Sequence, residues 1–544
     1  MSYIGIYGIQ DIKREDYPVM IHDHSFAIYE NGIISNYCHL ERITRKKYDN
    51  KLHDIIDDFL LKKISQQPNI ETIFVDSEVG RSFISSSGKI RFEVAPAEKL
   101  FAYPQEGVFY LFGKKHKGYA VSHELAHIFS CVPFYGIFKD NSLIIHYDGG
   151  ASLSNFSAWH FKDNKLNLLE YHYDLKPITS LFNSNALVFK LMNANIKNQN
   201  SVPGKFMAYA SYGRYEKEIE EWLQENNFFE DIWKNENVFF EKIKKKFGKT
   251  INKINLKDNF FKNIASTIHE VFIKESIKKI EKLQTKINAK YLYLTGGCAL
   301  NIKLNEKILK SGLFEDIFIP PCPGDSGLSI GAIACLIFFK NEKIEKHNVY
   351  LNNWGIEHYK LQQNIDFEKI ARLLVNKKII GICNEYAEAG PRALGNRSII
   401  ALPNSIELAK RLNEDIKKRE WFRPLAPIML EKNAKYFTDQ NLHHLARFML
   451  LNFSINENKK QEIIGCVHTD NSARIQVLFN KKENQFMYNL LKVLDDKYNI
   501  KALINTSFNC SGEPIIHNTY DAINSGKNMG IDTLILNGEI MNLK

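Results

Sequence analysis

The 544-residue sequence lacks the features of secreted and membrane proteins. Its eight cysteines are scattered singly and form no C-x-x-C pair, which excludes a zinc ribbon and a disulfide framework and favours a reducing compartment. The longest apolar run, residues 330–339, is about half of the roughly 20 residues that cross a bilayer. The first residues become charged before a signal-peptide apolar core could form. We therefore expect a cytoplasmic protein that uses no membrane.

Positive charge is present in excess, with a formal net charge of +10. The cations are spread along the chain, and local runs such as residues 242–249 are typical of a solvated helix face. A nucleic-acid partner therefore stays open only as a minor alternative. The length predicts two to four domains.

Strand and helix patterns divide the chain into two α/β parts. Short strands are expected at 3–9, 25–32, 33–40, 72–76 and 142–150, and Asn31-Gly32 predicts a hairpin turn. Residues 210–290 are helical in pattern, and 291–339 alternate strand, glycine turn and helix. The polar stretch 350–364 is the predicted linker to a second α/β part.

The segment His123-Glu124-Leu125-Ala126-His127 matches the H-E-x-x-H signature of zinc peptidases. Residues four apart share a helix face, so the two histidines could hold one metal ion. Asp148, at a predicted strand end before two glycines, and Asp325, in a Gly-Asp turn before a helix, could add oxygen ligands. Taken alone, each aspartate is more typical of a plain turn. Two imidazoles and two carboxylates suit Fe²⁺ or Mn²⁺ better than a structural zinc.

Anion-binding patterns occur at two further places. Gly296-Gly297, between a strand and a helix, could cradle an anion or let a nucleotide approach, although tight packing explains such a turn equally well. In the second α/β part, cations flanked by Pro, Gly and aromatic residues are joined by the polar turn 505–514, which favours a phosphate or carboxylate site. These cations are Arg392, Arg397, Lys417, Arg419, Arg423 and Arg474.

Several segments together resemble the O-carbamoyltransferases of the NodU/CmcH/TobZ family almost from end to end. They are HDHSFAIYENG and ERITRKK within 22–47, SHELAH, TGGCALN, PGDSG, GPRALGNRSI, REWFRPLAP and NTSFNCSGEPI. The family usually has His where this chain has Glu124, and its metal ligands are the first and last His of the motif. No second H-x-x-G-x-x-H segment follows, so we expect no protease.

The resemblance implies the fold class and the domains. Residues 1–349 would form an α/β actin-like ATPase domain (ASKHA, duplicated ribonuclease-H-like). After the linker 350–364, residues 365–544 would form a YrdC-like α/β domain. The helical region at about 160–290 would shape the acceptor pocket.

The resemblance also implies a two-step reaction that uses ATP with Mg²⁺ and carbamoyl phosphate as co-substrate. The YrdC-like domain would form carbamoyl-adenylate, with Lys417, Arg419 and Arg423 as catalytic residues. Other residues would bind the nucleotide and the carbamoyl-adenylate: Gly296, Gly297, Asn301, Gly324, Arg392, Asn396, Arg397, Ser398, Arg474, Asn505, Thr506, Ser507 and Asn509. His123, His127, Asp148 and Asp325 would hold a divalent Fe²⁺ or Mn²⁺ in the transfer site, and His22 would be the general base for the acceptor hydroxyl.

The acceptor is expected to be a hydroxyl on a small molecule, a sugar or a nucleotide, and the protein a monomer or homodimer. Threonylcarbamoyl transfer to tRNA and a non-catalytic nucleotide-binding role remain as alternatives. Two departures from the family pattern stand out: Glu124 beside the metal, and the sequence GGASLSNFS after Asp148 in place of Gly-x-Gly-Glu.

Overall fold

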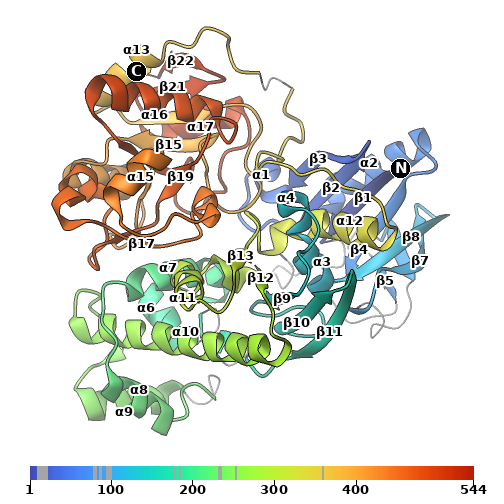
Figure 1. Ribbon diagram of the computed structural model, residues 1–544, viewed down its shortest axis with the longest axis horizontal. Coiled ribbons are helices and arrows are strands. Elements are labelled where there is room, and N and C mark those ends of the chain that lie inside the picture. The colour runs from blue at the N-terminus through green and yellow to red at the C-terminus, as the bar shows by residue number, and fades with distance from the viewer. Residues whose placement is uncertain are drawn as a thin grey trace.

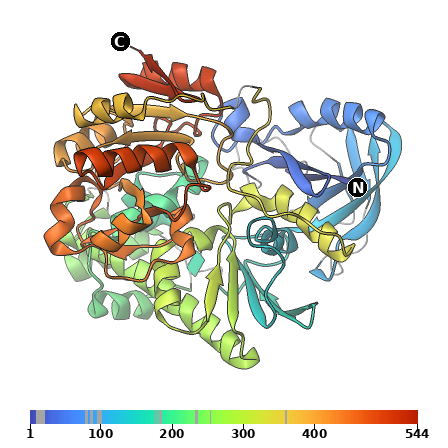
Figure 2. The same cartoon turned by 45° about the horizontal axis from the view of Figure 1, so that its top comes forward.

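In the computed structural model two sheets lie within residues 2–318 and a third, seven-stranded sheet within residues 380–542. For description we keep the predicted bounds and call residues 1–349 the N-terminal unit, 365–544 the C-terminal unit and 350–364 the connecting segment. In both views the C-terminal unit, coloured orange to red, lies against the green helical region of the N-terminal unit (Figures 1 and 2). The structure describes residues 1–8, 22–76, 82–84, 88–93, 101–175, 178–179, 181–182, 185–230, 236–251, 254–357 and 360–543.

The first sheet of the N-terminal unit has eight strands in the order β3-β2-β1-β4-β8-β7-β6-β5. The predicted hairpin at Asn31-Gly32 is confirmed, because both residues have positive φ (54° and 89°) between the antiparallel strands β2 and β3. Strands β1, β4 and β8 run parallel. The strands span β1 (Ser2–Tyr7), β2 (Ser25–Glu30), β3 (Ile33–His39), β4 (Glu71–Asp76), β5 (Ser82–Ile84), β6 (Ile90–Glu93), β7 (Gln105–Leu111) and β8 (Lys114–Ser122).

The second sheet repeats the strand order of the first. Its order is β11-β10-β9-β12-β13, with three consecutive antiparallel strands followed by two parallel ones, as in β3-β2-β1-β4-β8. The strands span β9 (Ser142–Tyr147), β10 (Phe156–Lys162), β11 (Lys165–His172), β12 (Tyr291–Thr295) and β13 (Asp316–Phe318). One topology is therefore used twice without a repeat in the sequence, and the predicted α/β class is confirmed.

Two buried helices lie between these sheets and carry the site: α3 (His123–Phe129) and α12 (Leu328–Phe339). Helix α12 is apolar on all sides, which predicts complete burial, and ten of its twelve residues are buried. A Cβ at Gly331 would lie 1.8 Å from the carbonyl oxygen of Ala126. The missing side chain therefore lets α12 approach α3 closely.

The helical region starts later than the predicted residue 160, because β10 and β11 occupy 156–162 and 165–172. It contains α6 (Ala186–Met192), α7 (Val202–Ala210), α8 (Lys217–Glu225), α9 (Glu236–Phe247) and the long helix α10 (Asn259–Ile287), with α11 (Ile302–Lys310) after β12. Shorter helices of the N-terminal unit are α1 (Leu40–Thr44), α2 (His53–Gln66) and α4 (Val132–Tyr135). Among the described residues, no helix combines the length and apolarity needed to span a bilayer.

The C-terminal unit is built on a seven-stranded mixed sheet in the order β19-β16-β20-β15-β14-β21-β22. Its strands are β14 (Ile380–Cys383), β15 (Arg397–Ala401), β16 (Ala426–Leu430), β19 (Gln476–Leu478), β20 (Ala502–Ser507), β21 (Thr533–Leu536) and β22 (Glu539–Asn542), beside the short pair β17 (Phe453–Ser454) and β18 (Ser472–Ala473). Its helices include α13 (Phe367–Val375), α14 (Ile406–Lys410), α15 (Glu431–Phe437), α16 (Gln485–Tyr498) and α17 (Thr519–Met529).

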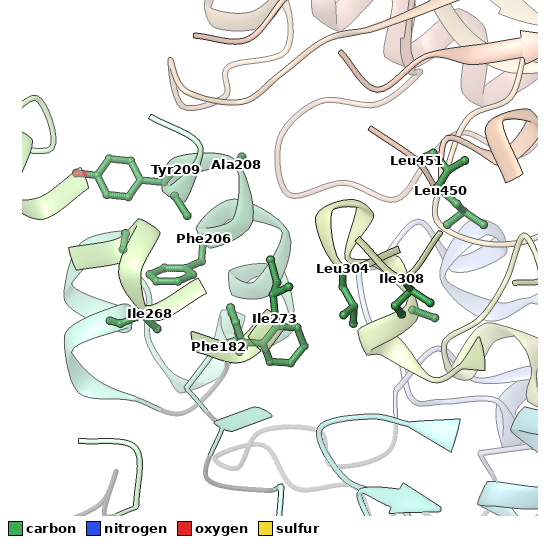
Figure 3. Close-up of a cluster of buried hydrophobic side chains, with 14 of the residues drawn as sticks. Phe182, Phe206, Ala208, Tyr209, Ile268, Ile273, Leu304, Ile308, Leu450 and Leu451 are labelled. Atoms are coloured by element: carbon green, nitrogen blue, oxygen red, sulfur yellow. The ribbon is translucent and has the colours of Figure 1, made fainter. Parts of the chain in front are cut away.

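The two units share part of their hydrophobic core. One buried cluster belongs to the C-terminal unit alone, but the largest cluster runs from the N-terminal helical region into residues 422–502. Figure 3 shows Leu304 and Ile308 of α11 facing Leu450 and Leu451 of the C-terminal unit. The first sheet of the N-terminal unit likewise has a buried cluster of its own, which includes Ile4, Phe26 and Phe74. Each unit therefore has a core of its own in part, and the largest cluster joins them.

Candidate functional site

The H-E-L-A-H segment forms helix α3 at the end of strand β8. Ser122 caps the helix, since its hydroxyl accepts a hydrogen bond from the backbone N–H of Leu125 at 3.1 Å. This start places His123 and His127 one turn apart on the same face, and their Nε2 atoms lie 3.0 Å apart. Both imidazoles are buried.

Two carboxylates reach these histidines from other elements. Asp148 follows β9, and Asp325 opens the 3-10 turn η5 (Asp325–Gly327) before α12. Asp325 Oδ1 lies 3.5 Å from His123 Nε2 and 3.4 Å from His127 Nε2, and Asp148 Oδ2 lies 3.8 Å from His127 Nε2. The four residues named from the sequence as metal ligands thus meet in one place, which we call the metal cluster.

The metal cluster fits a divalent cation. His127 Nδ1 lies 3.1 Å from the carbonyl oxygen of Pro323, so its N–H donates there and leaves the Nε2 lone pair facing the carboxylates. Burial disfavours a charged Asp325, but His123 and His22 hold the pKa of this carboxyl well below its usual range. Two carboxylates with two imidazoles form a donor set that suits Fe²⁺ or Mn²⁺.

Two further residues at the metal cluster were missed by the sequence analysis. The Tyr7 hydroxyl donates to Asp325 Oδ2 at 2.6 Å, which leaves Oδ1 for the histidines. The ring of His146 stacks on that of His127, with centroids 4.8 Å apart. Burial, with His127 and His123 nearby, lowers the pKa of His146 far below its usual value. Alternation along β9 places residues 146 and 148 on one face and could have indicated His146, whereas no local signal marks Tyr7.

Glu124 faces away from the histidines of its own helix. Its Oε1 accepts hydrogen bonds from the backbone N–H groups of Leu153 (2.8 Å) and Ser154 (3.0 Å) and from the Ser154 hydroxyl (3.3 Å). The two departures from the family pattern, Glu124 and the loop after Asp148, therefore contact each other. These bonds tie Oε1 to the loop, whereas Oε2 is buried and has no hydrogen-bond partner among the described residues.

His22 lies beside the metal cluster. Its Nδ1 lies 3.0 Å from Asp23 Oδ2 and its Nε2 lies 3.9 Å from Asp325 Oδ2. Burial lowers the pKa of His22, but Asp325 and Asp23 together raise it to about 10. These carboxylates favour the imidazolium form, whereas a general base must be neutral. A cation shared by Asp148 and Asp325 would offset the carboxylate charge and favour neutral His22.

The glycine turn after β12 also adjoins the metal cluster. The N–H of Gly297 donates to Asp148 Oδ2 at 2.5 Å, and a Cβ at Gly296 would lie 2.2 Å from the carbonyl oxygen of Tyr147. Asn301 caps α11 through Oδ1, and its Nδ2 contacts His269 Nε2 at 2.8 Å. Beyond Gly324 and its two chain neighbours, no heavy atom of the described residues lies within 4 Å of the position that a Cβ of Gly324 would occupy. These residues border the metal cluster and leave room at Gly324 for a ligand.

Four arginines form a second cluster, the arginine cluster, in the C-terminal unit: Arg392, Arg419, Arg423 and Arg474. Burial and the charge of Arg423 lower the pKa of Arg392 to about 10 and that of Arg419 to about 9. Buried donors of three of them, Arg392 Nε, Arg419 Nη2 and Arg474 Nε, have no hydrogen-bond partner among the described residues. Crowded cations with unused donors form a site prepared for an anion.

Lys417 is buried beside this cluster. Its Nζ donates to the carbonyl oxygens of Ser507 and Asn509, the latter at 2.7 Å. Burial, with Arg419 and Arg423 nearby, lowers the pKa of Lys417 well below its usual value. The lysine therefore stabilises the turn after β20 (Ala502–Ser507), and its charged end lies near Arg419 and Arg423.

The remaining predicted binding residues serve the unit's own structure. All three nitrogens of the Arg397 guanidinium donate to backbone carbonyl oxygens, namely those of His517, Asn384, Asn396 and Glu385. Asn396, Ser398 and Asn505 are buried in internal hydrogen bonds. Thr506, Ser507 and Asn509 lie in the strand end and turn that Lys417 holds. We therefore leave Arg397 out of the arginine cluster.

The two clusters meet at the interface of the units. Tyr48 of the N-terminal unit lies near enough to Arg423 for that charge to oppose the rise that burial causes in the tyrosine pKa. The ring of Tyr48 also meets that of His22 edge to face, with centroids 6.0 Å apart. Residues of the metal cluster and of the arginine cluster are thus linked through His22 and Tyr48.

Comparison with known proteins identifies the family of the chain. Family models described as carbamoyltransferase N-terminus and carbamoyltransferase C-terminus match residues 101–335 and 371–542. The chain is 31% identical over 425 residues to the protein named uncharacterised protein MJ1051 of Methanocaldococcus jannaschii, across 73% of this chain and 78% of that protein.

Other relatives carry the name of nodulation proteins. Nodulation protein U of Azorhizobium caulinodans is 24% identical over 557 residues, which cover 93% of this chain and 95% of that protein. Nodulation protein NolO of Bradyrhizobium diazoefficiens is 32% identical over 264 residues, 45% of this chain and 48% of that protein. The crystal structure of full-length HypF in the phosphate- and nucleotide-bound form aligns with 34% of this chain and 22% of that chain at 18% identity, but its TM-score of 0.24 carries no argument about the fold.

Proposed function

The chain belongs to the carbamoyltransferase family and is a carbamoyltransferase, and from that premise we propose an ATP-dependent O-carbamoyl transfer in two steps. The first step forms carbamoyl-adenylate from carbamoyl phosphate and ATP in the C-terminal unit. The second step transfers the carbamoyl group to a hydroxyl at the metal cluster. The observation that carries the proposal is the arginine cluster with its unused buried donors, because a phosphorylated substrate supplies the anion that it lacks.

In the first step a water molecule replaces the phosphate of carbamoyl phosphate, which releases phosphate and leaves carbamate. An oxygen of this carbamate then attacks the α-phosphorus of ATP. A new P–O bond forms as the bond to pyrophosphate breaks, which releases pyrophosphate. Arg392, Arg419, Arg423 and Arg474 would hold the phosphate and carbamoyl oxygens, and Mg²⁺ would accompany the ATP phosphates. Positioning and neutralisation of charge are most of what such chemistry requires. Lys417 would hold the turn at 505–509 in position beside these arginines, through its hydrogen bonds to the carbonyl oxygens of Ser507 and Asn509.

In the second step the acceptor oxygen attacks the carbamoyl carbon, and the bond from that carbon to the AMP oxygen breaks. His22, with Nδ1 held by Asp23, would take the hydroxyl proton on Nε2. His123, His127, Asp148 and Asp325 would hold a divalent cation that polarises the carbamoyl and phosphate oxygens as a Lewis acid. Gly296, Gly297, Asn301 and Gly324 would border the adenosine.

We also propose an actin-like fold for the N-terminal unit and a YrdC-like fold for the C-terminal unit. The repeated order of the two N-terminal sheets supports an actin-like, duplicated ribonuclease-H-like unit. A YrdC-like assignment of the C-terminal unit is supported by the turn TSFNCSGEP at 506–514 and by the cations around it. The acceptor pocket would lie toward the helical region that begins at α6. The expected acceptor is a hydroxyl of a small molecule, sugar or nucleotide.

Product analysis tests this function. Incubation with ATP should yield AMP and pyrophosphate only when carbamoyl phosphate is present, and a screen of candidate alcohols should show a mass gain of about 43 Da, that of a carbamoyl group replacing hydrogen. ADP as the product, or turnover that ignores carbamoyl phosphate, would rule out the adenylate route.

A further inference from the structure

His146 is the second-last residue of strand β9, and its ring contacts those of His123 and His127 on helix α3. Side chains alternate along a strand, so His146 and Asp148 point to one face and Tyr147 to the other. Tyr147 accordingly packs in the core beneath, with its ring stacked on Phe272. His146 and Asp148 therefore enter the metal cluster from the same strand, two residues apart.

The distances place His146 within ligand range of that cluster. His127, His146 and Asp148 each offer one ligand atom, and these atoms all lie within 4.8 Å of one another. A second triplet, His123, His127 and Asp325, meets the same limit and shares His127. The two triplets together describe one five-residue set around His127.

The two ring nitrogens of His146 are in different situations. Nδ1 lies 3.2 Å from the hydroxyl of Ser157, which stands directly opposite His146 in the pairing of β9 with β10. Nε2 is fully buried and has no hydrogen-bond partner among the described residues. A buried polar atom without a partner costs about 1–3 kcal/mol, and an ion that the site binds is one of the explanations for such an atom.

Ser157 gives this imidazole the support that metal-bound histidines receive. A ligating histidine usually directs its other ring nitrogen to a fixed polar group, which sets the tautomer and the ring orientation. The Pro323 carbonyl does this for His127, and the Ser157 hydroxyl stands in the same relation to His146. The position of His146 on β9, its burial and its Nε2 without a hydrogen-bond partner among the described residues are therefore all typical of a metal-bound histidine.

We propose that His146 is a third imidazole ligand of the proposed metal site, which then offers three nitrogen and two oxygen donors. The inference goes beyond the two-histidine set and depends on the proposed function only in requiring a cation at this site. A third imidazole shifts the donor set away from Mg²⁺, which prefers all-oxygen ligands, and toward Fe²⁺, Co²⁺ or Zn²⁺.

Proton NMR of the full-length Co²⁺-loaded protein tests the ligand count without any substitution. Each imidazole bound through one nitrogen carries an exchangeable N–H on the other, and this proton is shifted far outside the normal range by the paramagnetic ion. Three such signals, lost in D₂O, are expected. Two signals would overturn the inference and leave the proposed metal site intact, whereas a protein that binds no Co²⁺ would overturn both.

Two variants locate the third signal. His146→Asn keeps a polar atom near Ser157 but removes Nε2, so it should lose one shifted signal and bind Co²⁺ at least about 10–100-fold more weakly, the loss known for weaker outer-shell changes. His160→Asn, at a half-buried histidine of the neighbouring strand β10, is the matched control and should keep three signals. An unchanged signal count and dissociation constant in His146→Asn would show that His146 only packs against His127.

Discussion

Glu124 connects the helix of the metal cluster to the loop after Asp148. Its Oε1 is the acceptor for three donors of residues 153–154, and a glutamine carbonyl can accept the same bonds. We predict that Glu124→Gln keeps carbamoyl transfer within about tenfold, whereas Glu124→Ala leaves buried donors unpaired and costs about 1–3 kcal/mol of stability. Activity assays and urea unfolding measure the two effects. A roughly thousandfold loss in Glu124→Gln, the size expected for an acid–base group, would favour a metallohydrolase instead.

Tyr7 controls the second oxygen of Asp325. Its hydroxyl holds Oδ2 at 2.6 Å, so Oδ1 alone faces His123 and His127. We predict that Tyr7→Phe weakens metal binding about 10–100-fold, as loss of an outer-shell partner does. Calorimetric titration of the metal-free protein with Mn²⁺ measures this. Tyr37→Phe is a matched control, because this buried hydroxyl donates to the Ser326 carbonyl and not to a carboxylate. Equal affinities of wild type and Tyr7→Phe would contradict the role.

Helix periodicity relates His123 to His127, and the family resemblance added Asp148 and Asp325, each of which alone is more typical of a plain turn. Local patterns could not identify Tyr7, which lies 318 positions from its partner. Arg397, in contrast, was named from the sequence as a binding residue, but its guanidinium is occupied by the chain itself. Its motif looked like an anion site, but only the folded chain shows four backbone carbonyls around its guanidinium.

Among the elements, the strands were predicted best where turn chemistry or alternation is strong, as at Asn31-Gly32. The predicted start of the helical region near residue 160 was wrong, because β10 and β11 occupy residues 156–162 and 165–172. The sequence pattern itself had indicated helices only from residue 210. The repeated sheet order had no sequence signal, since strand pairing is decided by contacts distant along the chain.

The connecting segment depends on a buried histidine of the C-terminal unit. His517 Nε2 lies 2.7 Å from the Trp354 carbonyl oxygen, and the ring of Trp354 packs on Phe26 of the first sheet. Burial, opposed by that carbonyl and assisted by Arg397, Arg42 and Arg45, lowers the pKa of His517 to about 3. The unfolded chain binds this proton below about pH 6.5 and the folded chain does not, so stability falls as pH drops from 6.5 toward 3.

We predict that His517→Gln removes this part of the acid sensitivity. Between pH 7.5 and 5.5 the His517 contribution amounts to about 1.4 kcal/mol, so the free energy of unfolding of the variant should fall by that much less than that of wild type. Urea unfolding at the two pH values measures the difference. His269, whose pKa is also lowered to about 3, titrates in both proteins and cancels. Parallel pH dependences would contradict the assignment.

At the scale of the whole molecule, the two units form one body. The shared cluster around Leu304 and Leu450 is reinforced by polar contacts across the interface. They include the ion pair of Lys303 with Asp470 at 2.9 Å and the hydrogen bond between His443 Nε2 and Asp316 Oδ1 at 2.9 Å. The polar pattern at 350–364 predicted a linker but could not predict this contact, because the apolar residues of the two units are distant in sequence. Half-reactions are therefore best separated by substitution in the intact chain.

We propose that adenylate formation and carbamoyl transfer use different clusters of the same chain. Arg474 is the best probe of the first step, because the charges that lower its pKa, Arg392, Arg423 and Arg419, all belong to the C-terminal unit. His127 is the matching probe of the second step. Arg411→Ala, at an exposed arginine of the same unit, is the control and should leave both steps unchanged.

The most direct measurement is transfer activity with synthetic carbamoyl-adenylate in place of carbamoyl phosphate and ATP. Arg474→Ala should fail to make carbamoyl-adenylate but regain transfer when it is supplied. His127→Ala should still release pyrophosphate in the presence of carbamoyl phosphate and remain unable to transfer with either supply. Failure of the adenylate to rescue Arg474→Ala, or loss of pyrophosphate release in both variants, would contradict the account and indicate a single composite site.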